Sequence, residues 1–177
     1  FSAGKSTEWV PLLPGTDGAI ALAMCNVLVN ELGVYDATYL KTKTNAPYLI
    51  GPDGRYVREK GPARGVKGHW VDQKFVNRPV TFIGDDETNK PMVWDSVESK
   101  AKVYDDSSIK DFALEGSYEF RGTKCQPSFQ LVREHLKQYT PEMASKVSTV
   151  PAETIHRIAL EWAKNAQIGS TITIDGH

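Results

Sequence analysis

The sequence predicts an α/β fold that is interrupted by a long irregular insertion. Three observations lead to this prediction: a strand, a tight turn and a buried helix open the chain, periodicity then fades, and helices with an alternating strand close it. The chain has 177 residues, of which 40% are apolar and 24% charged, so it can bury a sizeable core. We divide it into residues 1–40, 41–125 and 126–177.

The opening element covers residues 1–40. Residues 8–13 are apolar and end at Pro14-Gly15, which predicts a strand that enters a turn. The apolar run that follows predicts a buried helix, with Leu22 and Leu28 in the core. Cys25 lies on the same helix and is expected to be buried, and a further short helix is expected over residues 34–40.

The insertion, residues 41–125, has little periodicity. Five prolines and six of the 14 glycines fall within residues 41–100, and short strands are expected at residues 79–83 and 92–94. Its charge is uneven: seven basic and two acidic residues occur over 55–78, against ten acidic and four basic ones over 85–119. These stretches are either solvated faces that pair with each other or a docking surface for a partner.

The closing element contains helices and a strand. Apolar residues recur at helical spacing in two places, at Phe129, Val132, Leu136 and Tyr139, and at Ile155, Ile158, Ala159, Trp162 and Ala166. Between them Thr140 and Pro141 form an N-cap and first position of a helix that should run to about Val147. Gly169 should end the last helix, and residues 170–174 alternate as a strand does.

The turn before the first long helix is the main candidate site. Gly15 permits close approach of a ligand to the backbone, Thr16 offers a hydroxyl, and Asp17 offers a carboxylate that can accept two hydrogen bonds from a guanine edge. The alternative is that Thr16 or Asp17 only caps its own helix.

Other chemistry has less support. Gly4-Lys5-Ser6-Thr7 matches the end of a phosphate-binding loop, but a predicted strand follows where that motif needs a helix. The histidines at 69, 135, 156 and 177 have no metal-ligand spacing, and the two cysteines at 25 and 125 exclude a four-cysteine zinc or iron–sulfur site. We therefore assign no catalytic and no metal-binding residue. The net charge of −1 argues against nucleic acid as a partner, and no apolar run is long enough to span a membrane.

Three segments carry a resemblance to a known family. Residues 8–24, Glu-Trp-Val-Pro-Leu-Leu-Pro-Gly-Thr-Asp-Gly-Ala-Ile-Ala-Leu-Ala-Met, resemble a signature of the molybdopterin oxidoreductases of the dimethyl sulfoxide reductase family. Residues 139–142 and 150–155 resemble two later family segments, in the family's order. The long middle of the chain, including residues 44–49 and 52–54, is similar to the longer insertions in the branch that handles sulfur oxyanions, arsenate or aromatic substrates.

The resemblance implies an internal fragment of a larger catalytic subunit, whose α/β part is a partial dinucleotide-binding, Rossmann-like domain. The implied cofactor is molybdenum or tungsten held by two molybdopterin guanine dinucleotides, with Gly15, Thr16 and Asp17 receiving one guanosine and Asp17 reading its guanine. A [4Fe–4S] cluster is expected only in the part of the protein that precedes this segment, so this chain alone is expected to be inactive.

The implied partners are the remainder of the catalytic subunit, together with iron–sulfur electron-transfer and membrane anchor subunits. The compartment is left open, although the resemblance is typical of a periplasmic or membrane-associated complex of bacteria or archaea. Two other functions remain open: a phosphate-loop nucleotide-binding protein, and a non-enzymatic interaction module.

Overall fold

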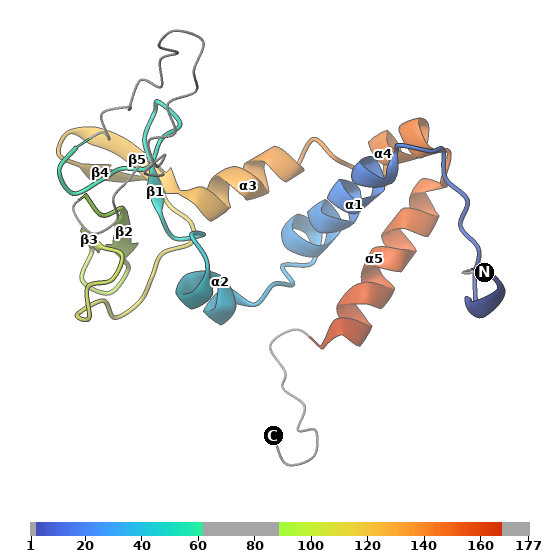
Figure 1. Cartoon of the computed structure of the whole chain (residues 1–177), viewed down its shortest axis with the longest axis horizontal. Coiled ribbons are helices and arrows are strands. Elements are labelled where there is room, and N and C mark those ends of the chain that lie inside the picture. Colours follow the sequence, from blue (N-terminus) through green and yellow to red (C-terminus); the bar gives the residue numbers. More distant parts are fainter. Residues whose placement is uncertain (1–2, 62–88, 168–177) are drawn as a thin grey trace, which may run out of the picture. The chain divides into compact units, whose positions relative to one another are not determined.

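The computed structural model describes residues 3–61 and 89–167, and these belong to two units (Figure 1). Unit 1 is drawn from residues 1–39 and 132–177, and unit 2 from residues 40–131. The strands predicted at residues 79–83 and 170–174, and the helix end predicted at Gly169, lie outside the described residues.

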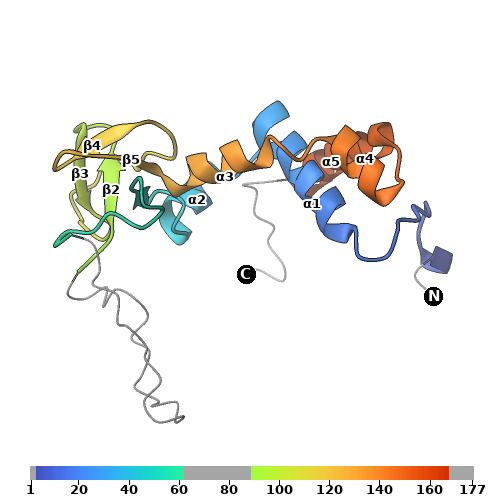
Figure 2. The same cartoon turned by 90° about the horizontal axis from the view of Figure 1, so that it is seen from above.

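Unit 1 contains three packed helices, α1 (Asp17–Asn26), α4 (Pro141–Ser148) and α5 (Ala152–Ala166), which lie side by side in both views (Figures 1 and 2). Their shared core consists of Ala23, Ala144, Val150 and Ile155, each at most 1% exposed. The two alanines have short side chains, which let α1 and α4 approach closely around the larger Ile155. A 3-10 turn, η1 (Ala3–Lys5), precedes these helices, and a π-helical segment, η2 (Val27–Glu31), continues α1.

The ends of α4 follow from its sequence. The hydroxyl of Thr140 accepts a hydrogen bond from the Met143 amide over 3.2 Å, with Pro141 as the first helical residue, so the predicted N-cap is confirmed. Thr149 then adopts a left-handed conformation, with φ of 68°, and ends the helix. Pro151 follows and precedes α5, which opens as predicted.

Three expectations for the start of unit 1 are wrong. Residues 8–13 form no strand, because a strand needs a neighbouring strand and the described residues of unit 1 provide only helices. Leu22 and Leu28 are half-buried rather than in the core, and Cys25 is exposed. The reason is that α4 and α5 cover only the side of α1 that carries Ala23, so the other sides of this apolar helix are not covered within the described chain.

Two other helices differ from the prediction, α2 in its extent and α5 in its burial. α2 (Ala37–Lys43) begins later than expected, because the carboxylate of Asp36 accepts the Tyr39 amide over 2.8 Å and caps the helix there. The apolar stripe of α5 also ends early, with Trp162 59% exposed. α5 has 15 residues and α4 only eight, so the C-terminal half of α5 is less covered.

α3 (Ser128–Leu136) spans the sequence division between the two units. Phe129 and Leu136 are buried as the helical spacing predicts, whereas Val132 is 52% exposed and Tyr139 lies beyond the helix end. The pattern therefore gives the helix correctly but overestimates how much of its apolar face is covered.

Unit 2 contains two small antiparallel sheets. One has the order β1-β5-β4, formed by β1 (Leu49–Ile50), β4 (Tyr118–Phe120) and β5 (Thr123–Pro127). The other is the hairpin of β2 (Met92–Asp95) and β3 (Lys100–Val103), in which Asp95 pairs with Lys100, so the strand predicted at residues 92–94 is confirmed.

Leu49, Met92 and Cys125 form a buried apolar cluster in unit 2. The rings of Trp94 and Tyr118 stack beside it, with centroids 4.3 Å apart. In neither described stretch, 3–61 or 89–167, is there a helix long and apolar enough to cross a bilayer.

Candidate functional site

The predicted site lies in unit 1, in a tight turn formed by Leu13-Pro14-Gly15-Thr16. The Thr16 amide donates to the Leu13 carbonyl over 3.2 Å, and Gly15 has a φ of 83°. Proline at the second position and a positive φ at the third are the features of a type II β-turn, and glycine adopts that φ at no steric cost. The Pro14-Gly15 pair therefore fixes the direction in which the chain enters α1.

Thr16 and Asp17 do not cap α1 with their side chains. The Thr16 hydroxyl points back and donates to the Leu13 carbonyl over 2.6 Å, while the Thr16 carbonyl accepts the Ala19 amide over 3.0 Å and starts the helix. Asp17 is exposed in the first turn, and its carboxylate makes no hydrogen bond or ion pair within the described chain. The capping alternative is therefore not realised, and the Asp17 carboxylate is available to a ligand.

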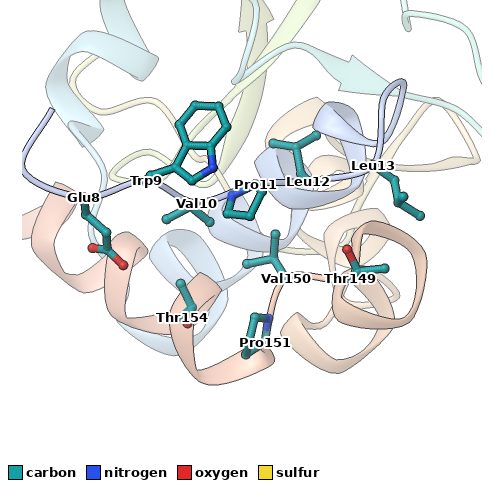
Figure 3. Close-up of a pocket in the computed structure, with 10 residues that line it drawn as sticks. All are labelled: Glu8, Trp9, Val10, Pro11, Leu12, Leu13, Thr149, Val150, Pro151 and Thr154. Carbon is teal, nitrogen blue, oxygen red and sulfur yellow. The ribbon is translucent and has the colours of Figure 1, made fainter. Parts of the chain in front are cut away.

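A cleft of about 370 Å³ lies directly before the turn (Figure 3). It runs between the irregular chain of residues 8–13 and the junction of α4 with α5, and it is lined by Glu8, Trp9, Val10, Pro11, Leu12, Leu13, Thr149, Val150, Pro151 and Thr154. At its edge Glu8 pairs with Arg157 over 2.6 Å. Seven of the ten residues that line the cleft are apolar, and its one acidic side chain, Glu8, already has a partner.

The phosphate-binding loop is not supported by the structure. Gly4 and Lys5 lie in the three-residue turn η1, and the next helix begins only at Asp17. The helix that such a motif needs directly after its lysine is therefore absent from residues 6–16.

The histidines and cysteines form no site in the described part of the chain. His156 lies 3.1 Å from Glu31, and His135 packs on Tyr139, while His69 and His177 lie outside the described residues. Burial raises the pKa of the Cys125 thiol. Over residues 3–61 and 89–167, His, Cys, Asp and Glu nowhere form a group of three that could hold a metal ion.

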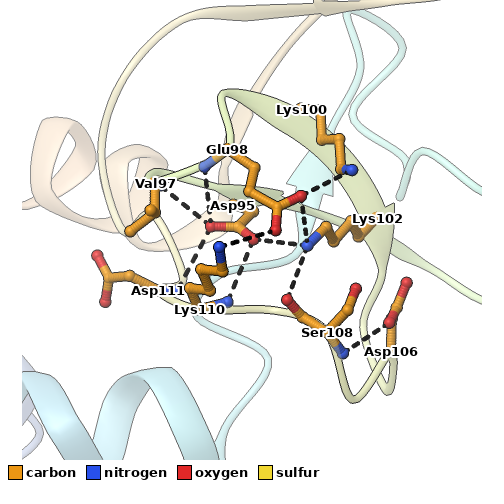
Figure 4. Close-up of polar contacts among 9 residues, drawn as sticks. All are labelled: Asp95, Val97, Glu98, Lys100, Lys102, Asp106, Ser108, Lys110 and Asp111. Atoms are coloured by element: carbon orange, nitrogen blue, oxygen red, sulfur yellow. Dashed lines mark hydrogen bonds and ion pairs between the residues drawn. The ribbon is translucent and has the colours of Figure 1, made fainter.

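The hairpin of unit 2 carries a buried charge network that the sequence analysis did not predict (Figure 4). Asp95 is 0% exposed and its carboxylate lies 2.8 Å from the Lys102 ammonium, which also donates to the Ser108 carbonyl over 2.8 Å. Four backbone amides donate to the same carboxylate over 3.0–3.4 Å, those of Val97, Glu98, Lys110 and Asp111.

Electrostatics keep this network ionised. The hydrogen bond from Lys102 lowers the pKa of Asp95 well below its usual range, although burial opposes this. Hydrogen bonds from Lys100 and Lys102 lower the pKa of Glu98 to about 2. Burial by itself would lower the pKa of Lys102, but its two carboxylate partners outweigh burial and raise it.

The network ties the hairpin to the loop that follows it and has the character of a structural element. The acidic stretch thus pairs at least partly with its own lysines. An alternation of acid and lysine on opposite strands of a predicted hairpin, as at Asp95 and Lys102, was the available signal in the sequence.

No protein-family model matches the chain. Curated relatives do. It is 36% identical over 155 residues to a sulfite dehydrogenase subunit of Allochromatium vinosum, in an alignment that covers 87% of this chain and 15% of that protein. It is 32% identical over 188 residues to the alpha subunit of the perchlorate reductase of Dechloromonas aromatica, covering 92% of this chain and 19% of that protein. The chain belongs to the molybdopterin oxidoreductases of the dimethyl sulfoxide reductase type.

A third relative of this molybdopterin oxidoreductase chain is dopamine dehydroxylase of Eggerthella lenta. The identity is 51% over 222 aligned positions, covering 88% of this chain and 22% of that protein. The chain therefore spans less than a quarter of the length of each of these three relatives. The family resemblance stated from residues 8–24, 139–142 and 150–155 is confirmed, whereas the roles of Gly15, Thr16 and Asp17 stay predictions.

Proposed function

We propose that this chain is the part of a molybdenum oxidoreductase catalytic subunit that holds the guanosine end of one molybdopterin guanine dinucleotide. Gly15, Thr16 and Asp17 would form the contact, with the Asp17 carboxylate accepting hydrogen bonds from guanine. The turn would belong to a partial dinucleotide-binding domain.

The observation that carries this proposal is the unpartnered Asp17. A carboxylate that neither caps its helix nor pairs with a neighbouring cation contributes little to the local fold. It follows a turn whose geometry depends on Pro14-Gly15, and Leu13, the first residue of that turn, lines a cleft whose volume is within the range of small-ligand sites. Both features favour a ligand at this point of the chain.

The chemistry of the turn fits the guanine end of the cofactor. A carboxylate would repel phosphate, but it matches the two adjacent donors of a guanine edge, the ring N–H and the exocyclic amine, and charged partners make such hydrogen bonds strong. When bound, the cofactor supplies the molybdenum redox chemistry. The residues of this chain bind and orient one of its ends.

The relatives also support a cofactor role rather than a substrate role for this segment. They are named for sulfite, perchlorate and dopamine, which are chemically unlike one another, yet each aligns with 87–92% of the chain. A segment shared among enzymes of such different substrates is better explained by what their chemistry has in common. For the whole protein we propose two-electron redox or oxygen-atom transfer at molybdenum, with iron–sulfur and membrane anchor subunits as partners.

The test is Asp17→Asn and Asp17→Ala in the intact protein, with molybdenum and guanine content measured per chain. Asparagine keeps the size of the side chain but places an amide group against the donor edge of guanine. Loss of a charge-assisted contact should weaken cofactor affinity by about 1.5–3 kcal/mol in both variants.

Asp36→Asn is the matched control, because Asp36 is a carboxylate that does cap a helix, through the Tyr39 amide. Asparagine and aspartate cap helices about equally, so this variant should keep both its stability and its cofactor. Full cofactor content in Asp17→Asn would show that Asp17 does not read guanine.

A further inference from the structure

The backbone of Leu13 is held from both sides. Its carbonyl accepts the amide and the hydroxyl of Thr16, over 3.2 and 2.6 Å, which closes the turn. Its amide donates to the Ser148 carbonyl over 3.1 Å. The second contact joins the turn to the end of α4, which is more than a hundred residues away in sequence.

The Ser148 carbonyl is held in a fixed position. Ser148 is 0% exposed, and its hydroxyl donates to the Ala144 carbonyl over 2.7 Å and accepts the Val150 amide over 3.3 Å. The left-handed conformation of Thr149 turns the chain at this point, and the Thr149 hydroxyl donates to the Ser148 carbonyl over 2.6 Å.

We propose that Ser148 is a positioning residue for the cofactor contact: by fixing the carbonyl that holds Leu13, it sets where the turn presents Asp17. This inference rests on the proposed function. It adds that cofactor affinity depends on the junction of α4 with α5, although the Ser148 hydroxyl forms its hydrogen bonds with Ala144 and Val150 and not with the turn.

The first test is Ser148→Ala in the intact protein, with the rate of cofactor release measured from the molybdenum and guanine lost over time. A protein hydrogen bond is worth about 0.5–1.5 kcal/mol, so release should become about 2- to 12-fold faster. Ser145→Ala is the matched control on the same helix, because Ser145 is half-buried and one turn earlier, and it should leave the release rate unchanged.

A purely structural role for Ser148 is separated by a double-mutant cycle with Thr16→Val, which removes the hydroxyl that donates to the Leu13 carbonyl. If both residues act by holding the backbone of Leu13, their effects on the release rate should be less than additive in free energy. Additive effects, or no effect of Ser148→Ala on release, would overturn the inference.

Thr149→Gly keeps the test decisive if Ser148→Ala folds poorly. Glycine accepts the positive φ of this position without strain, so thermal stability should hold, while the hydroxyl that steadies the Ser148 carbonyl is lost. Release should again be faster, and an unchanged rate would count against the inference.

The failure of this inference can be distinguished from the failure of the proposed function. If Asp17→Asn keeps its cofactor, the proposed function fails and this inference fails with it. If Asp17→Asn loses cofactor but Ser148→Ala and Thr149→Gly have no effect on release, only the inference fails.

Discussion

Ile155→Ala should destabilise unit 1 by about 2–5 kcal/mol, the usual range for emptying a buried isoleucine site. Ile155 is 0% exposed and is the largest side chain of its core cluster, in which two of the other members are alanines. The substitution removes three carbon groups, worth about 0.8 kcal/mol each in transfer free energy. The small neighbours can fill little of the space, so a cavity cost adds to this and places the effect in the upper half of the range.

Native-state hydrogen exchange is the suitable assay, because a protein as long as the relatives of this chain need not unfold in one step. In the intact protein, amides of α1, α4 and α5 should lose protection together in Ile155→Ala. Leu160→Ala, on the same helix but at a residue 41% exposed, should change protection far less. Equal effects of the two substitutions, or an Ile155→Ala effect below about 0.5 kcal/mol, would refute the assignment of this core.

Two further predictions concern unit 2. Gly116→Ala should lower the free energy of unfolding by about 1–3 kcal/mol, because Gly116 has a φ of 124° and an added Cβ would overlap the Tyr118 hydroxyl. Gly122→Ala should lower it less, because Gly122 has a φ of 74° and open space around it, and thermal unfolding of the two variants tests this order. The pKa of Glu98 falls from its usual 4.5 to about 2 on folding, so its stabilising effect is complete above pH 4.5 and is lost as the pH falls toward 2. An acid titration followed by Trp94 fluorescence should show this loss, and Glu98→Gln should make the profile flatter, whereas identical profiles would contradict it.

Sequence reasoning succeeded where local chemistry decides the structure. The N-cap at Thr140 and the tight turn at Pro14-Gly15 follow from a few neighbouring residues, and both are present. It failed where a distant partner decides. Residues 8–13 have the composition of a strand, but they lie against a helix junction and have no strand beside them in the described chain.

The same distinction applies to burial and to charge. An apolar helix such as α1 has more apolar surface than its neighbours in the described chain cover, so its composition places Leu22 and Leu28 too deep. The pairing of Asp95 with Lys102 depends on the register of a hairpin that spacing alone does not give. The α/β class, the division of the chain into residues 1–40, 41–125 and 126–177, and the cofactor role of the turn stay predictions.

The order of the two units along the chain is compatible with the proposal that one cofactor segment serves enzymes with different substrates. The turn and the α4–α5 junction that holds it come from opposite sides of unit 2 in sequence, and both belong to unit 1. The alignment with dopamine dehydroxylase runs over 222 positions, more than the 177 residues of this chain, so that relative has additional residues within the segment. Because the entropic cost of closing a loop grows only slowly with its length, residues added within unit 2 need not disturb the contact between Leu13 and Ser148. The middle of the segment can therefore vary while the cofactor contact that we propose at the turn, and the α4–α5 junction that holds this turn, are kept.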